Sequence, residues 1–206
     1  MVKEIRIYCE GGSAKRDQSD LLKRGLNIFF QELVGLARAK NIRWRLTLCK
    51  SRNLAFEGFE TAMKSFPEAF NVLLVDSEAP VTSPAWQHLK QTDKWRLTQE
   101  QDSQCHLMAQ AMEAWLIADL ETLKKHYGQS FNANPIPTAQ NVEQIAKDRL
   151  APMLNEATRQ TQKGKYDKIK HAGEILQKLD VAKVRQAAPH CDRLFKTLAE
   201  KMDTDN

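Results

Sequence analysis

The sequence predicts an α/β fold, in which a parallel sheet is flanked by helices and followed by a helical C-terminal part. Strand-like and helix-like segments alternate over residues 4–76. Within them, the apolar run 72–75 lacks the polar alternation of a strand that faces solvent on one side. Such a run is typical of a strand that helices cover on both faces, and right-handed crossovers would make the sheet parallel.

The first strand is predicted over residues 4–10, where β-branched and aromatic side chains precede a turn at Gly11 and Gly12. A carboxylate, Glu10, stands at the end of this strand. Apolar residues then recur at helical spacing from about residue 20 to residue 40, with basic residues on the other sides. We expect one long amphipathic helix there.

The next strand is predicted over residues 41–49, where apolar and polar side chains alternate as they do nearer the edge of a sheet. Asn53 is a suitable cap for the helix that follows, whose apolar stripe covers residues 55–66. Pro67 stops that helix. The buried strand at 71–76 comes directly after it.

The middle of the chain contains an irregular segment followed by a strongly helical one. Residues 79–102 show no clear periodicity, and we expect a loop or a short helix around Trp86, with a weak fourth strand near residues 95–98. Residues 104–127 are rich in Ala, Leu and Met and are closed by Gly128, which predicts the strongest helix of the protein.

Three polar residues of that helix, His106, Gln110 and Glu113, would share one stripe of an otherwise apolar surface. Polar groups on a buried helix need partners. His106 and Glu113 therefore form either a hydrogen-bonded pair within the core or a pair that supports a catalytic site.

The C-terminal part reads as helical. Asp180 and Pro189 are suitable helix starts. The sequence predicts an α/β core over residues 1–128 and a helical extension over 129–206 that packs on the same core. The helices expected in that extension are 142–161, kinked or divided at Pro152, then 172–179, 181–187 and 189–202.

Composition restricts the class of protein. The 206 residues are enough for a sizeable core, and the net charge of +5 favours polyanionic partners such as nucleic acid. The four cysteines form no Cys-x-x-Cys pair, so we expect reduced thiols that are mostly buried. The sequence shows no apolar run of membrane-spanning length and no signal peptide, so we expect no membrane association and a cytoplasmic location.

Carboxylates follow the first strand and the buried strand. Because the carboxyl ends of parallel strands share one edge of the sheet, Glu10, Asp76 and Glu78 are expected to converge there. Carboxylate ligands without Cys or well-spaced His point to Mg²⁺ or Mn²⁺. The structural alternative is a strand end whose turn is capped by Asp76 and Ser77.

A lysine-rich segment near the C-terminus is a candidate for binding phosphate groups. Lys165, Lys168, Lys170 and His171 lie close together around one tyrosine and would contact the phosphates of a nucleic acid. The alternative is a solvated, lysine-rich connection.

The order of these elements, with Glu10-Gly11 after the first strand and Asp76-x-Glu78 after the third, resembles the Toprim domain of topoisomerases, primases and overcoming-lysogenization-defect nucleases. More closely, the chain resembles a Toprim-like family, domain-of-unknown-function family 4276. This resemblance rests on Glu10-Gly11-Gly12, Leu74-Val75-Asp76-Ser77-Glu78, His106-Leu107-Met108, Met112-Glu113-Ala114-Trp115, the segment from Lys165 to His171, and Pro189-His190-Cys191.

The resemblance implies a Mg²⁺-dependent nuclease, with Asp76 and Glu78 as metal ligands and Glu10 as acid, base or further ligand. Glu78 departs from the Asp-x-Asp pair of Toprim domains, and its longer arm would shift the metal. Members of the family are often encoded beside ABC- or AAA-type ATPases, which implies a role in anti-phage defence.

Two other functions agree with the same residues. The first is a catalytically inactive Toprim-like subunit that binds and regulates a partner ATPase. The second is a phosphoacceptor domain of the response-regulator type, which would need an acidic pair after the first strand, where only Glu10 stands.

Overall fold

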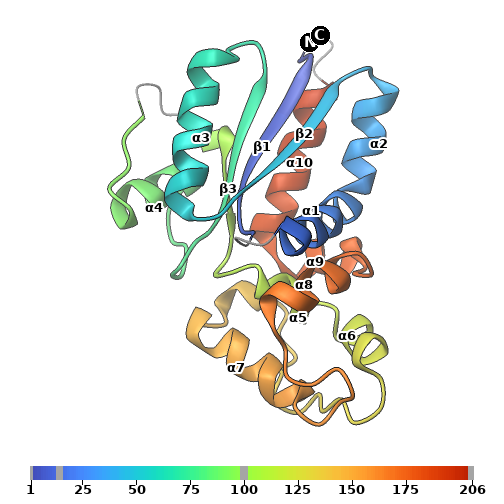
Figure 1. Cartoon of the computed structure of the whole chain (residues 1–206). Coiled ribbons are helices and arrows are strands. Elements are labelled where there is room, and N and C mark those ends of the chain that lie inside the picture. The colour runs from blue at the N-terminus through green and yellow to red at the C-terminus, as the bar shows by residue number, and fades with distance from the viewer. Residues whose placement is uncertain (1, 13–15, 98–101, 204–206) are drawn as a thin grey trace.

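The computed structural model describes residues 2–12, 16–97 and 102–203. Its four strands form one parallel sheet in the order β2-β1-β3-β4. The strands are β1 (Glu4–Glu10), β2 (Arg43–Cys49), β3 (Phe70–Asp76) and β4 (Cys105–Met108). The predicted α/β fold is confirmed, with helices on both faces of the sheet and a helical C-terminal part (Figure 1).

The helices fall into two layers. The apolar side of α3 (Arg52–Ser65) and of α4 (Ala85–Thr92) packs on one face of the sheet, against Leu73 and Val75 of β3. The other face, which includes Val72 and Leu74, packs on a larger core. β3 is therefore buried along its whole length, as its apolar run predicts.

Helices from both the N-terminal and the C-terminal half of the chain build the larger core. In Figure 1, α10 lies along the sheet while α5 to α8 form the part below it. These helices are α1 (Arg16–Phe29), α2 (Gln31–Ala39), α5 (Glu113–Ile117), α6 (Leu120–Tyr127), α7 (Lys147–Thr158), α8 (Lys168–Leu176), α9 (Val181–Ala187) and α10 (Pro189–Asp203), with the short 3₁₀ turn η2 (Val142–Gln144). A second 3₁₀ turn, η1 (Asp102–Gln104), precedes β4.

The helix expected over residues 20–40 is in fact two helices, α1 and α2. Phe30 lies between them with φ −90° and ψ 14°. Its ring is fully buried and contacts the rings of Phe29 and Phe195. The break between the two helices thus lies at a residue whose large aromatic side chain is buried in the core.

The single helix predicted over 104–127 is wrong. Its first residues form β4, which pairs with β3, and the helices α5 and α6 follow after a loop. Ala, Leu and Met favour helices, but pairing with a buried strand outweighs this local preference. The fourth strand is therefore β4. The described residues 95–97 of the segment expected to hold it form no strand, and residue 98 lies outside the described residues.

The helix ends follow local sequence signals in most cases. Asp180 caps α9, α10 begins at Pro189, and α6 ends before Gly128, which has φ +70°. The cap of α3 is Ser51, which accepts a hydrogen bond from the backbone of Leu54, so the assignment to Asn53 is wrong. Between residues 142 and 161 the structure forms η2 and then α7, which runs through Pro152.

All four cysteines are free thiols, and three of them are buried, as expected. None of the helices in the described part of the chain has the length and apolar character needed to span a bilayer.

Candidate metal centre

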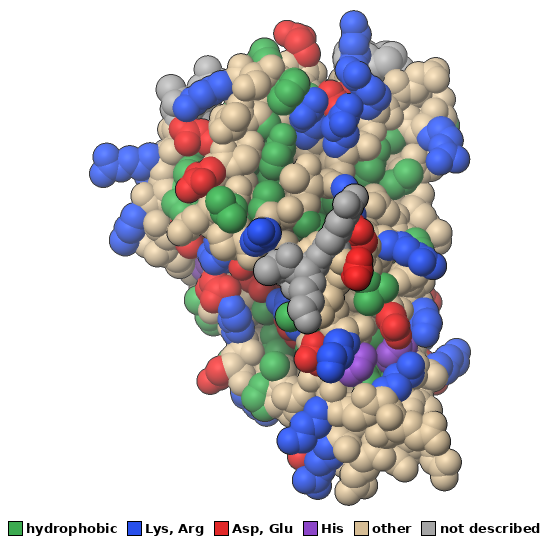
Figure 2. Space-filling view, in the orientation of Figure 1, with side chains coloured by type: hydrophobic (Ala, Val, Ile, Leu, Met, Phe, Trp, Pro, Cys, Tyr) green, Lys and Arg blue, Asp and Glu red, His purple; other side chains and the backbone are tan. Residues whose placement is uncertain are grey.

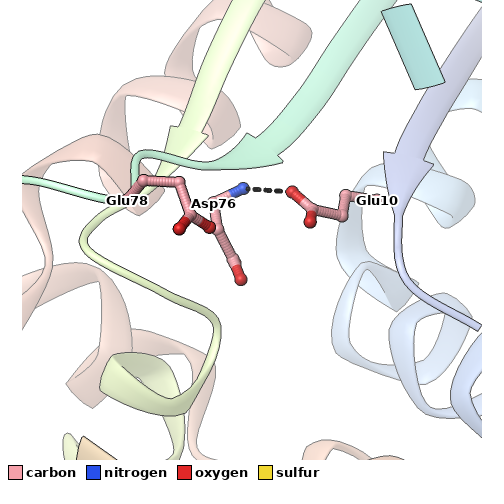
Figure 3. A group of neighbouring side chains, drawn as sticks. All are labelled: Glu10, Asp76 and Glu78. Carbon is pink, nitrogen blue, oxygen red and sulfur yellow. Dashed lines mark hydrogen bonds between the residues drawn. The ribbon is translucent and has the colours of Figure 1, made fainter. Parts of the chain in front are cut away.

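Three carboxylates meet at the carboxyl edge of the sheet. β1 and β3 are parallel neighbours, so their ends place Glu10 and Asp76 side by side, and Glu78 follows on the loop after β3 (Figure 3). One oxygen of each carboxylate lies within 4.8 Å of one oxygen of each of the others. The backbone N–H of Asp76 donates to Oε2 of Glu10 at 3.1 Å. The predicted convergence is therefore present.

The loop after β3 is held by the last residue of β4 and by the loop that follows β4. The backbone N–H groups of Ser77 and Glu78 donate to the carbonyls of Met108 and Gln110, at 3.1 and 3.0 Å. Glu78 has φ +65°, in the left-handed region that residues other than glycine seldom adopt. This backbone turn directs the Glu78 side chain toward Asp76.

The central carboxylate, Asp76, is only 4% exposed, and its Oδ1 accepts a hydrogen bond from the backbone N–H of Met112 at 2.9 Å. Burial raises the pKa of Asp76, although Lys168 opposes the change. Burial and the negative charge of Asp76 raise the pKa of Glu10 to about 7. Near neutral pH, Glu10 therefore exists in both the protonated and the ionised form.

Each carboxylate has a cationic partner from a different helix. Arg52 of α3 lies 3.4 Å from Glu10, and Lys168 of α8 lies 3.5 Å from Asp76. Glu78 pairs with Lys147 of α7. Like charges that are this close repel one another, and the three cations offset that repulsion.

Arg52 is itself fixed. Its guanidinium makes two hydrogen bonds to the carboxylate of Asp93, at 3.0 and 2.8 Å, and donates to the backbone carbonyl of Asp76. A two-pronged contact of this kind sets the orientation of the planar guanidinium. The carboxyl end of β3 is thus attached to the start of α3.

Lys168 is held by a second acid, Glu113, which is 6% exposed. Oε2 of Glu113 lies 3.2 Å from the Lys168 ammonium, and its Oε1 accepts a hydrogen bond from the Tyr166 hydroxyl at 3.2 Å. The nearby Asp76 and Glu113 raise the pKa of Lys168 against the opposing effect of burial, so this side chain stays charged.

A pocket of about 210 Å³ opens beside these carboxylates. Its position depends on a close crossing of α1 and α8, where Gly25 meets Gly173: a Cβ atom added to Gly25 would lie 2.5 Å from the carbonyl oxygen of Gly173. The residues that line the pocket are Glu10, Gly11, Gly12, Gln18, Leu22, Lys50, Asp76, Met108, Met112, Lys168 and Ile169.

The structure does not bring His106 to this site. His106 lies in β4, where its Nε2 is 3.0 Å from the carbonyl of Ser103 and its Nδ1 is 3.4 Å from Arg193. Burial, and then the charge of Arg193, lower the pKa of His106 to about 3, so it is neutral. The expected pair with Glu113 is not formed, because the two residues lie on a strand and a helix instead of on one helix face.

Of the four expected phosphate-binding residues, only Lys168 lines the pocket. Lys165 and Lys170 are exposed on either side of the start of α8. Nδ1 of His171 accepts a hydrogen bond from the backbone N–H of Asp167 at 3.0 Å, and its ring lies against Tyr127.

Sequence reasoning missed three functional candidates, namely Arg52, Lys147 and Tyr166. Arg52 follows the carboxyl end of β2, so the rule that sends strand ends to one edge could have found it. Lys147 and Tyr166 reach the site only through the packing of the C-terminal part, which no local pattern indicates.

The donor set fits a hard divalent cation. Three carboxylates offer oxygen atoms alone, as Mg²⁺ and Mn²⁺ prefer, and no cysteine lines the pocket among the described residues. Lys168 and Arg52 would add positive charge for an anionic substrate. By their chemistry, these side chains would suit a cation beside a phosphate group.

Comparison with curated proteins and with solved structures returns no match. A family model does match, over residues 9–199, which include every residue of the carboxylate cluster and its cationic partners. The chain therefore belongs to the family described as "Domain of unknown function (DUF4276)".

Proposed function

We propose that the protein is a Toprim-like, Mg²⁺- or Mn²⁺-dependent enzyme that cleaves phosphodiesters, in the manner of a nuclease. The observation that supports this most is the convergence of Glu10, Asp76 and Glu78 beside a pocket that also contains the ammonium of Lys168. The left-handed backbone of Glu78 supports it further, because strained conformations gather at functional sites.

Asp76 and Glu78 would hold the metal ion, which would supply positive charge to stabilise the phosphodiester as negative charge builds on it. Glu10 would hold or release a proton, since its pKa of about 7 suits a general acid or base. Oε2 of Glu10 accepts hydrogen bonds from Asp76 and Arg52, so the proton is expected on Oε1.

A nucleic acid is the proposed substrate. The net charge of +5 favours a polyanion, and Figure 2 shows Lys and Arg side chains spread over the visible face from top to bottom. Such a distribution suits contacts along a phosphate backbone and provides no pattern for reading base sequence.

The test is a thermal-shift titration with MgCl₂ and MnCl₂, followed by cleavage assays on DNA and RNA. We expect either metal to raise the Tm, and we expect Asp76→Ala to abolish both the shift and cleavage. Glu60→Ala is the matched control, since Glu60 lies on the exposed side of α3 and pairs with Lys64. A metal-induced shift that persists in Asp76→Ala would remove Asp76 from the metal site.

One observation favours a second candidate, a catalytically inactive subunit that regulates a partner ATPase of the ABC or AAA type. Arg52, Lys147 and Lys168 already neutralise the three carboxylates. If these ion pairs are permanent, the cluster is structural and the protein acts by binding. Co-purification with the ATPase, with no metal-induced shift and no cleavage alone or together, would favour this candidate.

A further inference from the structure

A second pocket, of about 300 Å³, lies next to the carboxylate pocket. Residues at the ends of β3 and β4, or just after them, line both pockets. Pro80 and Gln110 line the second pocket, while Asp76 and Met108 line the first. Between them, the backbone N–H of Glu78 donates to the carbonyl of Gln110. This hydrogen bond joins the chain segments that line the two pockets.

The second pocket contains a fixed carboxylate–histidine pair. Glu143 of η2 is 7% exposed, and both of its carboxylate oxygens contact one residue, His190 at the start of α10. Oε1 accepts a hydrogen bond from the His190 backbone N–H at 2.8 Å, and Oε2 lies 2.6 Å from Nδ1. An ionised carboxylate only accepts hydrogen bonds, so Nδ1 carries a proton and the ring is locked in orientation.

The other ring nitrogen of His190, Nε2, makes no hydrogen bond to any of the described residues, and the side chain is 24% exposed. The described residues that line the pocket include no Lys, Arg or Cys, and no acid besides Glu143. A metal ion would lack enough ligands, and a multiply charged anion would lack cations. The lining instead combines amide groups, from Asn141 and Gln144, with the apolar surface of Pro80, Val81 and Pro189.

We propose that this pocket binds a nucleoside, that is, the base and sugar of a nucleotide whose phosphate lies at the carboxylate cluster. A flat base with hydrogen-bonding edges matches amide groups, an imidazole and apolar surfaces, which are the means by which proteins hold unstacked bases. The volume is at the lower end of small-molecule sites, about 300–1,000 Å³. The position of the phosphate rests on the proposed function, whereas the binding of a nucleoside in this pocket does not.

The test uses the full chain with ¹⁵N-labelled histidines and no metal, titrated with adenosine, guanosine, cytidine and uridine. These probes carry no phosphate, so they report on the nucleoside pocket alone. The chain has five histidines, and His190→Gln assigns the imidazole signal of His190. We expect at least one nucleoside to shift that signal in a saturable way, with smaller changes at the other four.

Gln144→Trp is the blocking variant, since Gln144 is exposed and lines the pocket, so a tryptophan there would occupy part of its volume. It should weaken nucleoside binding by about tenfold or more, because the tryptophan would occupy space that the nucleoside needs. Glu60→Ala, on the exposed side of α3, should bind nucleosides as the wild type does.

Two results would overturn the inference: no nucleoside shifts His190, or Gln144→Trp binds as tightly as the wild type. If either occurs while the metal-induced Tm shift remains, the nucleoside pocket alone is wrong. If nucleosides bind and the metal-induced shift is absent, the proposed metal site is wrong and the pocket stands.

Discussion

The two neighbouring pockets hold acidic side chains in different ways. The carboxylate pocket crowds Glu10, Asp76 and Glu78 together and needs a cation from each of three helices, α3, α7 and α8. The second pocket contains one buried acid, Glu143, and a single residue, His190, satisfies both of its oxygens. The crowded acids thus depend on the relative placement of several elements, whereas the single buried acid depends on one partner residue.

The largest effect on stability is expected from moving α8. Described residues of α8 line the carboxylate pocket and none of them lines the second pocket. Gly25→Ala would place a Cβ atom 2.5 Å from the Gly173 carbonyl oxygen, so α1 and α8 must separate. We expect a loss of about 3 kcal/mol or more in the free energy of unfolding, measured by urea denaturation.

Gly35→Ala is the matched control for this substitution. Gly35 lies within the exposed side of α2, and an added Cβ atom meets nothing within 4 Å. Alanine should stabilise that helix by up to about 1 kcal/mol. If Gly25→Ala were as stable as the wild type, the close crossing of α1 and α8 would be wrong.

The second prediction concerns pH and tests the crowding of acids. The folded protein holds the Glu10 proton up to about pH 7, whereas the unfolded chain releases it near the usual pKa of 4.5. The stabilisation is therefore complete below pH 4.5 and is lost as the pH rises through 7. At 1.36 kcal/mol per pKa unit, the rise from 4.5 to about 7 corresponds to a loss of about 3 kcal/mol.

Urea denaturation in the presence of a chelator, at about pH 4 and about pH 8, measures this loss. Glu10→Gln should reduce the difference between the two pH values, because glutamine does not titrate. Glu60→Gln, on the exposed side of α3, should keep the wild-type difference. An unchanged pH dependence in Glu10→Gln would contradict the raised pKa of Glu10.

The smallest effect is expected from the lysines that face the carboxylates. The ammonium groups of Lys147 and Lys168 compete with a divalent cation for Glu78 and Asp76. Lys147→Ala and Lys168→Ala should therefore bind Mg²⁺ about three- to tenfold more tightly, as measured by calorimetry.

Two controls separate the pockets in this experiment. Lys170→Ala removes an exposed charge two residues after Lys168 on α8, and His190→Gln changes the second pocket, so neither should alter the affinity for Mg²⁺. Weaker Mg²⁺ binding in Lys147→Ala would show that this lysine supports the metal site instead of competing for it.

The order of secondary structure could be predicted best where the hydrophobic period is unambiguous. The alternation in β2 and the continuous apolar run of β3 identified an edge strand and a central strand, and both assignments are confirmed. The helix prediction for 104–127 was wrong because the alanines, leucines and methionines of this segment suit a helix, whereas β4 is defined by pairing with β3. Pairing partners lie far apart in the chain, so a local period does not reveal them.

The carboxylate cluster likewise has features that the sequence predicts and features that only the structure shows. The sequence alone determined that Glu10, Asp76 and Glu78 share one edge, because each follows a strand of a parallel sheet and such strands end together. Only the tertiary structure decided which cations face them, that His106 is a neutral core residue, and that Glu143 pairs with His190. The reason is physical: strand direction is a local property that the chain encodes in its pattern, whereas contacts between side chains of distant helices exist only once those helices have packed.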